Sequence, residues 1–217
     1  EGAAVALLAR SRGELAEVAR AVAAAGGRAL PLAVDVTEEA AVDAAIEQVE
    51  REFGRLDVLV NNAGLFKVKP LVELDRATWE ALLATNLSGP FFATRAVVRA
   101  MLRRPAVAGR VARAIVNVSS EAGKRGFAGS TAYCATKYGL CGFGDALREE
   151  LRGHAIRVIQ VLPGQVDTQA WDACGLDLAR LGIRRESMLR PEQVADAIAH
   201  AVLAEGAVVE ELLLKPP

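Results

Sequence analysis

A tyrosine and a lysine that could handle protons lie one helical turn apart, in the segment Tyr133-Cys-Ala-Thr-Lys137. At positions i and i+4 of a helix, two side chains share one face. A cation held beside a phenol favours the phenolate, so it lowers a tyrosine pKa that starts at about 10. Such a tyrosine can act as a general acid or base near neutral pH. A pair of serines, Ser119-Ser120, lies shortly upstream.

Three predicted strands end in polar or glycine-containing segments. These are Asp35-Val36, Asn61-Asn62-Ala63-Gly64 and Pro163-Gly164. Each could be an ordinary turn, and Asp35 or Thr37 could serve as a helix N-cap. Open α/β sheets bind ligands outside the carboxyl ends of their strands. Three such ends in one chain therefore favour a shared ligand crevice over three unrelated turns.

The rest of the chain alternates between short apolar runs and longer amphipathic runs. The apolar runs predict strands at Ala4–Leu8, Ala29–Val34, Leu56–Val60, Arg113–Val118, Ile156–Leu162 and Val208–Leu214. The amphipathic runs predict helices at Gly13–Ala25, Glu38–Phe53, Arg76–Arg103, Thr131–Gly153 and Pro191–Glu205. Strands that are apolar throughout indicate a parallel sheet covered on both faces. We therefore expect an α/β fold, a doubly wound Rossmann-type parallel sheet with helices on both faces, in a single domain spanning residues 1–217.

Composition narrows the function classes. The net charge of −1 over 217 residues offers no basic face, so we expect no nucleic-acid partner. No apolar run approaches the roughly 20 residues of a membrane helix, so we expect no membrane partner. The three cysteines are odd in number and fit reduced thiols in a cytoplasmic protein. The two histidines lie far apart without a ligand cluster, so we expect no metal site.

Taken together, the motifs resemble those of the classical short-chain dehydrogenase/reductase family. Their order and spacing match that family from its second strand to its last. The motifs are Asp35-Val36, Asn61-Asn62-Ala63-Gly64, Asn86, Ser120, Tyr133-x-x-x-Lys137 and Pro163-Gly164-x-Val166-x-Thr168. The family pattern places its catalytic serine thirteen residues before the tyrosine, which selects Ser120 rather than Ser119.

The resemblance implies hydride transfer between a nicotinamide and a carbonyl or alcohol carbon. Tyr133 would give or take the proton, and Lys137 would keep its pKa low and bind the nicotinamide ribose. Ser120 would donate a hydrogen bond to the substrate oxygen. Asn86 would hold a water that links Lys137 to solvent. An asparagine that bonds to the backbone at a helix irregularity is the alternative for Asn86, and both can be true.

The resemblance also implies cofactor contacts. Asp35 and Val36 would contact the adenine. Asn62, Ala63 and Gly64 would line the ribose and the nearby backbone. The nicotinamide amide would be held by Pro163, Gly164, Val166 and Thr168. After the first predicted strand, Arg10 and Ser11 stand where a carboxylate would bond the adenosine ribose. Because these residues can pair with a 2′-phosphate, NADP(H) is favoured over NAD(H). A solvated basic turn at a helix start is the alternative.

Residues 169–189 are predicted to form a lid on the substrate side. Its apolar residues would line a pocket for a moderately apolar substrate, or would pack on the core as a helix. They are Trp171, Leu176, Leu178, Leu181 and Met188, with Gly175 and Gly182 as pivots.

The family's first strand and its glycine-rich phosphate turn are absent from these 217 residues. Gly123, Gly126 and Gly129 do not form that fingerprint and are expected to shape a loop beside the site. In the family's sheet order, the absent strand lies between Ala4–Leu8 and Leu56–Val60. Its loss would leave unpaired backbone groups, at about 1–3 kcal/mol each. We therefore expect a native protein longer by roughly 30 residues, and weak or no NADP(H) binding by these residues alone.

The leading hypothesis is an NADP(H)-dependent carbonyl reductase or alcohol dehydrogenase, acting on 3-oxoacyl thioesters, sugars, simple ketones or steroids. By the same resemblance, we expect a homodimer or homotetramer formed through the helices that flank the serine strand. Small residues would permit close approach there, namely Gly139, Gly142, Gly144 and Ala146. A non-catalytic dinucleotide-binding regulatory or scaffold protein is the alternative from another class. An isomerase or dehydratase on the same fold is a third hypothesis.

Overall fold

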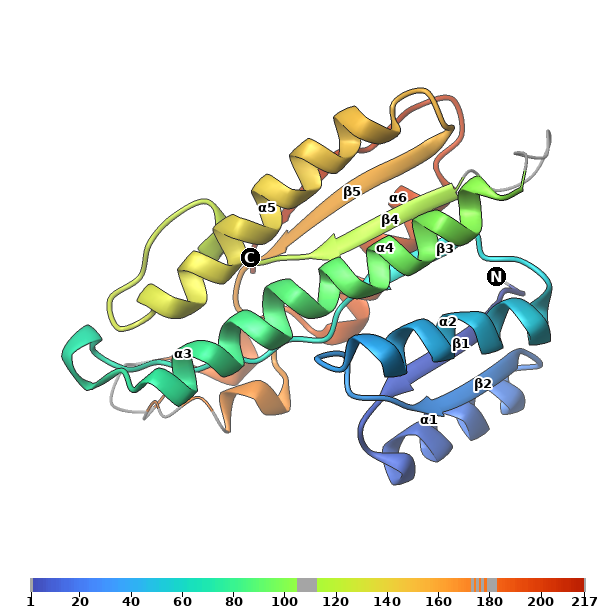
Figure 1. The fold of residues 1–217 in the computed structure, drawn as a ribbon. Coiled ribbons are helices and arrows are strands. Elements are labelled where there is room, and N and C mark those ends of the chain that lie inside the picture. The colour runs from blue at the N-terminus through green and yellow to red at the C-terminus, as the bar shows by residue number, and fades with distance from the viewer. Residues whose placement is uncertain are drawn as a thin grey trace. The chain divides into compact units, whose positions relative to one another are not determined.

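The strands form two parallel sheets in the computed structural model, which describes residues 2–104, 113–172, 174, 176, 178 and 183–216. One sheet pairs β1 (Ala4–Ala9) with β2 (Arg28–Ala33). The other has the order β3 (Val58–Asn61), β4 (Arg113–Val118), β5 (Ile156–Pro163) and β6 (Glu211–Leu214), as Figure 1 shows. The predicted parallel α/β class is confirmed. Within the described part of the chain, β1 pairs only with β2, and β3 pairs only with β4. The two strands predicted to keep an unpaired edge are β1 and β3.

In the described part of the chain six α-helices lie between successive strands, two of them, α3 and α4, between β3 and β4. They are α1 (Arg12–Ala24), α2 (Glu39–Phe53), α3 (Arg76–Leu83), α4 (Gly89–Leu102), α5 (Thr131–Leu151) and α6 (Pro191–Leu203). The single helix predicted at Arg76–Arg103 is wrong, because a π-helical turn at Ala84–Ser88 separates α3 from α4. Pro90 explains the break, since it has no N–H to donate to the carbonyl four residues earlier, that of Asn86. No described helix is both long and apolar enough to cross a bilayer.

The chain divides into two compact units. The first comprises Glu1–Leu56 and Ser88–Pro105, and the second comprises Asp57–Leu87 and Ala106–Pro217. A single domain over the whole chain stays a prediction.

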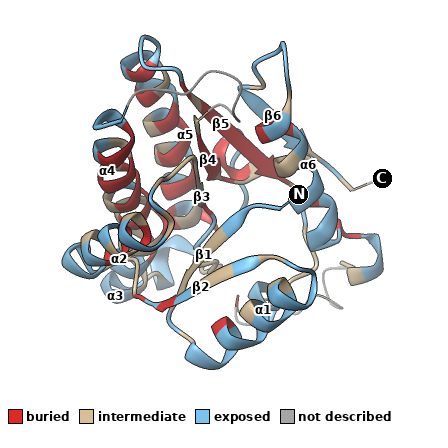
Figure 2. Cartoon of the chain, turned by 90° about the vertical axis from the view of Figure 1, so that its right-hand side faces the viewer, coloured by how far each residue is buried: buried red, intermediate tan, exposed pale blue. Residues whose placement is uncertain are grey.

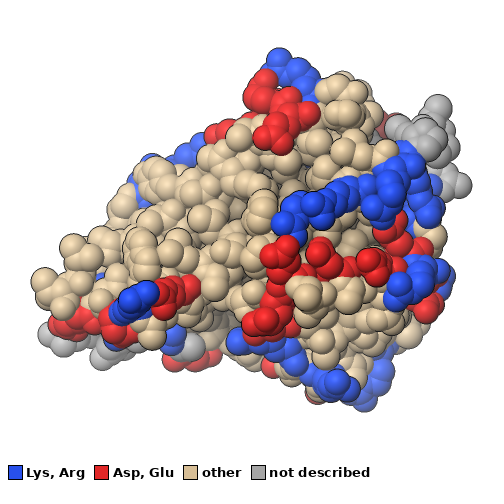
Figure 3. Space-filling view, viewed as in Figure 1, with Lys and Arg blue, Asp and Glu red and all other residues tan. Residues whose placement is uncertain are grey.

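In the first unit, α1 covers the β1–β2 sheet, and α2 packs against α4. The N-cap of α1 is Ser11, whose Oγ accepts a hydrogen bond from Glu14 N at 3.3 Å. Ion pairs connect α4 to α2, with Arg95 to Glu39 and Arg103 to Glu50. Figure 3 shows these basic and acidic rows side by side on this face. Basic side chains of the α4 segment therefore lie beside acidic side chains of α2.

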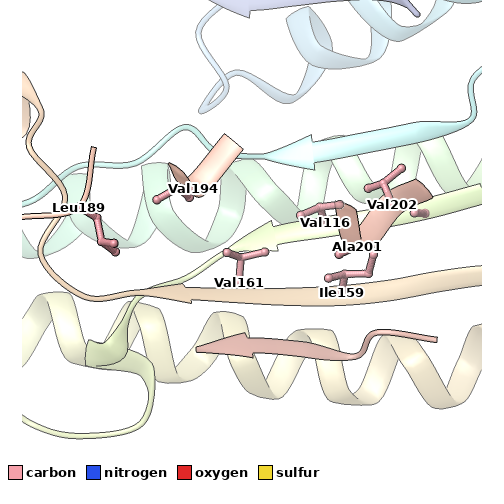
Figure 4. Close-up of a cluster of buried hydrophobic side chains, with 8 residues drawn as sticks. Val116, Ile159, Val161, Leu189, Val194, Ala201 and Val202 are labelled. Carbon is pink, nitrogen blue, oxygen red and sulfur yellow. The ribbon is translucent and has the colours of Figure 1, made fainter. Parts of the chain in front are cut away.

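In the second unit, β4 and β5 form the centre of the core and carry apolar side chains on both faces. One face packs under α6 and forms the cluster of Figure 4, namely Ala114, Val116, Ile159, Val161, Leu189, Val194, Ala201 and Val202. The opposite face lies under α5, where Gly144 meets Asn117 and Gln160. Both faces of these two strands are therefore covered, as their apolar sequences predict.

The β1–β2 sheet is less buried than the centre of the second unit. Figure 2 shows β1 and β2 mostly exposed or half-buried, whereas β4 is almost entirely buried. In the described part of the chain each of the two strands has only one partner strand, so each has one edge whose backbone groups are unpaired in the sheet.

Candidate active site

Tyr133 and Lys137 lie one turn apart near the start of α5, as predicted. Lys137 is only 5 % exposed, and its Nζ donates a hydrogen bond to the carbonyl of Val118 at 3.0 Å. The same Nζ is 5.7 Å from the centroid of the Tyr133 ring, which is a cation–π distance. The end of β4, where Val118 lies, therefore holds the ammonium beside the tyrosine.

The two serines after β4 have different surroundings. Ser119 is buried, where its Oγ donates to the carbonyl of Lys137 at 3.1 Å and accepts from the thiol of Cys141 at 3.3 Å. Ser120 is half-buried and hydrogen-bonds to the Tyr133 side chain. Its Oγ also accepts from Ala122 N at 3.1 Å. Ser120 is thus the serine beside the phenol, whereas Ser119 fixes α5 to the end of β4.

Burial shifts the pKa values of both Tyr133 and Lys137. It raises the pKa of Tyr133 above its ordinary value, and the hydrogen bond with Ser120 acts in the opposite direction. Burial also lowers the pKa of Lys137, to about 8, because an ammonium is costly to desolvate. The sequence predicted that Lys137 would lower the pKa of Tyr133. In this structure burial instead raises the pKa of Tyr133, so the phenol is held in its protonated form.

Asn86 lies in the π-helical turn and is 1 % exposed. Its Oδ1 accepts from Leu65 N at 2.7 Å, and its Nδ2 donates to the Leu65 carbonyl at 2.9 Å. Nδ2 also donates to Thr136 Oγ1 at 3.1 Å, one residue before Lys137. The alternative considered for this residue, an amide bonded to the backbone at a helix irregularity, is confirmed. Asn86 connects the loop after β3 to the helix that carries the tyrosine.

The segment after β3 divides into a structural residue and an open stretch. Asn61 is buried and donates from Nδ2 to Asn117 Oδ1 on β4 at 2.9 Å. Asn62, Ala63 and Gly64 are exposed. A Cβ on Gly64 would lie 3.7 Å from Asn86 Oδ1 and 3.9 Å from Lys137 Nζ. The open stretch therefore runs directly past the lysine.

The end of β5 contributes to a cavity of about 680 Å³. Asn62 and Thr168, two predicted cofactor residues, both line it, together with Asp167, Gln169, Ala170, Arg185 and Pro191. Val166 forms a bridge with Leu189 instead of lining this cavity. Gly164 N donates to the Leu214 carbonyl at 2.8 Å, and Pro163 is buried. Contact of either residue with a cofactor stays a prediction.

Two of the three loop glycines are required by close contacts. A Cβ on Gly123 would lie 2.7 Å from Cys141 Sγ and 2.9 Å from the Lys137 carbonyl. Gly129 has φ +72°, the left-handed region that favours glycine. Nothing lies within 4 Å of a Cβ on Gly126. The loop beside the site is therefore shaped chiefly by Gly123 and Gly129.

The remaining predicted cofactor residues belong to the first unit. Asp35 accepts from Thr37 N at 3.0 Å and from Thr37 Oγ1 at 2.8 Å, which with nearby Arg10 lowers the pKa of the Asp35 carboxyl. The N-cap of α2 is Glu38, so the suggestion that Asp35 or Thr37 caps this helix is wrong. Contact of a cofactor with Arg10, Ser11, Asp35 or Val36 stays a prediction.

Comparison with known proteins identifies the family. A family model described as short chain dehydrogenase matches residues 1–178. The chain belongs to this family. Every residue predicted for the site lies within the matched range, whereas α6 and β6 lie beyond it.

Individual relatives agree with this family. Sorbitol dehydrogenase of Cereibacter sphaeroides is 40 % identical over 157 residues, which cover 72 % of this chain and 59 % of that protein. Cis-4-hydroxycyclohexanecarboxylate dehydrogenase of Sinomonas cyclohexanicum is 39 % identical over 187 residues, covering 84 % of this chain and 73 % of the relative. A metagenomic short-chain oxidoreductase solved in complex with NADP superposes with a TM-score of 0.81 at 35 % identity, covering 100 % of this chain and 86 % of that one.

Sequence reasoning missed two residues of this short-chain dehydrogenase site. Thr136 binds the amide of Asn86, and Phe66 packs against Tyr133 with ring centroids 4.9 Å apart. Both lie within two residues of a recognised motif, but neither residue type signals chemistry by itself.

The predicted lid is described only in part. Trp171, Leu176 and Leu178 are half-buried and Met188 is buried. Gly175, Leu181 and Gly182 lie outside the described residues. Among the residues with described positions, no three histidine, cysteine, aspartate or glutamate side chains gather as metal ligands.

Proposed function

We propose that this short-chain dehydrogenase is an oxidoreductase that interconverts a small-molecule carbonyl compound and the corresponding alcohol with NADP(H). The observation that carries the proposal is the position of the buried Lys137 Nζ 5.7 Å from the centroid of the Tyr133 ring, with Ser120 beside the same phenol. The names of the two relatives, which are dehydrogenases for sorbitol and for a hydroxycyclohexanecarboxylate, support alcohol chemistry.

The protonation states suit the reduction direction. A phenol whose pKa is raised by burial stays protonated at neutral pH, so Tyr133 has a proton that it would donate to the oxygen of the substrate as negative charge develops there. Ser120 would hold the same oxygen by a second hydrogen bond. Lys137, with a pKa of about 8, is mostly cationic at neutral pH and would stabilise the phenolate left behind. A bound nicotinamide supplies or accepts the hydride.

The residues around Lys137 fit such a cofactor. Gly64 leaves open the space beside Lys137 Nζ that a side chain would narrow. Asn62 and Thr168 face one cavity, where an amide and a hydroxyl can bind the polar edges of a nucleotide. Lys137 would bind the ribose, as the sequence predicts. These residues hold and orient the cofactor, and Tyr133 handles the proton.

The preference for NADP(H) is part of the proposal. Arg10 is exposed at the end of β1, and a guanidinium binds a phosphate through paired, charge-assisted hydrogen bonds. The structural neighbour solved with NADP supports this choice. Replacement of Arg10 by Asp should lower kcat/KM for NADPH by about 10–100-fold and spare NADH, as expected for one lost charged hydrogen-bonding partner. An unchanged ratio of the two cofactors would exclude Arg10 as the determinant.

The activity itself can be tested with the full-length protein. NADPH oxidation should be followed at saturating cofactor over ketones, aldehydes and 3-oxoacyl thioesters, with Tyr133→Phe as the matched variant. The proposal predicts turnover by the wild type and its loss in the variant, with NADPH binding retained. Cofactor binding without turnover of any carbonyl compound would favour the regulatory alternative.

We also propose a cytoplasmic homodimer or homotetramer. The cysteines Cys134, Cys141 and Cys174 are free thiols, which suits a reducing compartment. A Cβ on Gly139 would lie close to Leu87, and one on Gly144 close to Gln160. Packing within the subunit therefore already explains these two glycines. Tyr138, Gly142 and Ala146 of α5 are exposed at i, i+4 and i+8, on one face of the helix, and would meet a partner there.

A further inference from the structure

Three aromatic rings stand in a row at the candidate site. The Phe66 ring is 4.9 Å from that of Tyr133 at an interplanar angle of 64°, and 5.3 Å from that of Trp171 at 75°. Both are edge-to-face contacts of the kind that aromatic pairs prefer. All three residues are half-buried, so each keeps part of its surface open. Phe66 therefore lies between the predicted proton donor and the described start of the lid.

Two of the three rings, those of Phe66 and Trp171, are held in place by hydrogen bonds that involve neighbouring backbone. Leu65, which precedes Phe66, is held through both its N–H and its carbonyl by the buried amide of Asn86. Trp171 donates from Nε1 to the carbonyl of Val166 at 2.8 Å, and Val166 in turn bridges to Leu189. Neither ring therefore depends on a bound ligand for its position.

The rings of Phe66 and Trp171 have no polar group that is free to bind a substrate. Phe66 has no polar side-chain atom, and the indole N–H is the only donor that Trp171 possesses. Because this donor is already bonded to Val166, the surface that the two rings present is carbon alone. The hydroxyls of Tyr133 and Ser120 lie at the Tyr133 end of the row, and the proposed reaction uses both on one substrate oxygen.

We propose that Phe66 and Trp171 form an aromatic wall beside Tyr133 that selects an alcohol or ketone whose reacting carbon is flanked by apolar groups, such as an alicyclic ring. This inference rests on the proposed function. A polyol would bring further hydroxyls against the wall, where each would lose water without gaining a partner. An alicyclic ring would instead remove apolar area from water on both sides of the contact.

The test compares cyclohexanol with sorbitol as substrates of the full-length protein and NADP⁺. Wild type, Phe66→Ala and Phe66→Leu are compared by kcat/KM, with Phe53→Ala as the matched control. Phe53 is also half-buried and stacks under Arg28 in the first unit, outside the site. Thermal unfolding of each variant shows that it is folded, and Phe66→Leu keeps apolar volume if Phe66→Ala unfolds.

The wall predicts a higher kcat/KM for cyclohexanol than for sorbitol in the wild type. Phe66→Ala should lower the cyclohexanol value by about 10–100-fold, the range expected when a substrate loses apolar contacts in its pocket. The sorbitol value should change less than the cyclohexanol value, and Phe53→Ala should change neither. A wild type that prefers sorbitol, or a Phe66→Ala variant with an unchanged ratio, would overturn the inference while leaving the proposed function in place.

A binding measurement separates this inference from the reaction. These 217 residues contain two tryptophans, Trp79 and Trp171, so Trp79→Phe leaves Trp171 as their only reporter. Cyclohexanol should shift the emission of Trp171 in this variant, and the additional change Phe66→Ala should weaken that binding. An emission shift without turnover would support the wall and contradict the proposed function. No shift with cyclohexanol, or an equal shift with sorbitol, would contradict the wall.

Discussion

The side chain of Asn86 forms hydrogen bonds with both backbone groups of Leu65, at 2.7 and 2.9 Å, from the π-helical turn between α3 and α4. These two hydrogen bonds hold the loop after β3, which contains the exposed residues Asn62–Gly64 and the ring of Phe66. The third bond of the amide reaches Thr136, next to Lys137. One buried side chain thus positions the loop and the helix that together form the site.

Replacement of Asn86 by Ala should destabilise the protein by about 2–3 kcal/mol, because the N–H and the carbonyl of the half-buried Leu65 would both lose their partner. Urea unfolding of the two proteins measures this change. Asn62→Ala is the control, since Asn62 is exposed and its replacement should change stability by less than about 0.5 kcal/mol. Equal stability of Asn86→Ala and wild type would show that the amide does not hold the loop.

A methyl group at position 123 should be poorly tolerated. The Cβ of Gly123→Ala would approach Cys141 Sγ to 2.7 Å and the Lys137 carbonyl to 2.9 Å, so α5 would have to shift. We expect a loss of about 1–3 kcal/mol, as for overpacking in other cores. Gly126→Ala is the matched control, because open space surrounds its Cβ. Thermal melts of both variants decide the matter, and the same melting temperature for both would refute the close contact.

Lys137 should cost the protein stability at neutral pH. Its pKa is lowered by burial from the ordinary 10.5 to about 8. Below pH 8 the folded protein must keep a charge in a buried place, which costs about 3 kcal/mol at 1.36 kcal/mol per pKa unit. Between pH 8 and 10.5 the unfolded chain binds more protons at this side chain, so stability rises with pH and the penalty disappears.

The variant Lys137→Met should therefore be more stable than wild type at pH 7, by about 2 kcal/mol after allowance for the lost hydrogen bond to Val118. The advantage should shrink between pH 8 and 10.5. Chemical unfolding at pH 7 and at pH 10 measures both effects. A variant that is less stable at pH 7, or whose advantage is the same at both pH values, would contradict the buried ammonium.

The exposed stripe on α5 predicts where subunits meet. Tyr138 is 47 % exposed, and a Cβ on Gly142 meets nothing within 4 Å in the structure. Gly142→Arg should thus leave the fold intact, since there is room for the side chain, but should dissociate a dimer or tetramer. Light scattering after gel filtration gives the mass, with Gly126→Arg as control. Dissociation by both variants, or by neither, would place the interface elsewhere.

Much of the fold follows from the sequence because apolar runs and amphipathic runs have different periods. The strand predicted at Arg113–Val118 has the same bounds in the structure, and Tyr133 and Lys137 share a helical face as expected. The break at Ala84–Ser88 could have been found from Pro90, whose missing N–H interrupts a helical ladder. The amphipathic pattern on both sides of Pro90 nevertheless predicts one continuous helix.

Other features depend on tertiary contacts that no local pattern contains. The partners of Asn86, Leu65 and Thr136, are 21 and 50 residues away from it in the chain. The raised pKa of Tyr133 results from burial by segments such as that of Phe66, so residue spacing alone favoured the opposite sign. The division of the strands into two sheets, by contrast, occurs where an unpaired edge was predicted.

The most direct test of Tyr133 as the proton donor in a hydride transfer uses labelled cofactor. NADPH carrying deuterium at both hydrogen positions of C4 is incubated with the full-length protein and a ketone that it reduces, and the product is analysed by mass spectrometry and NMR. The account predicts one deuterium on the carbinol carbon. It also predicts that Tyr133→Phe lowers the rate by at least about 100-fold, the usual contribution of a positioned general acid, with NADPH binding unchanged. Product without deuterium, or a Tyr133→Phe variant with full activity, would contradict it.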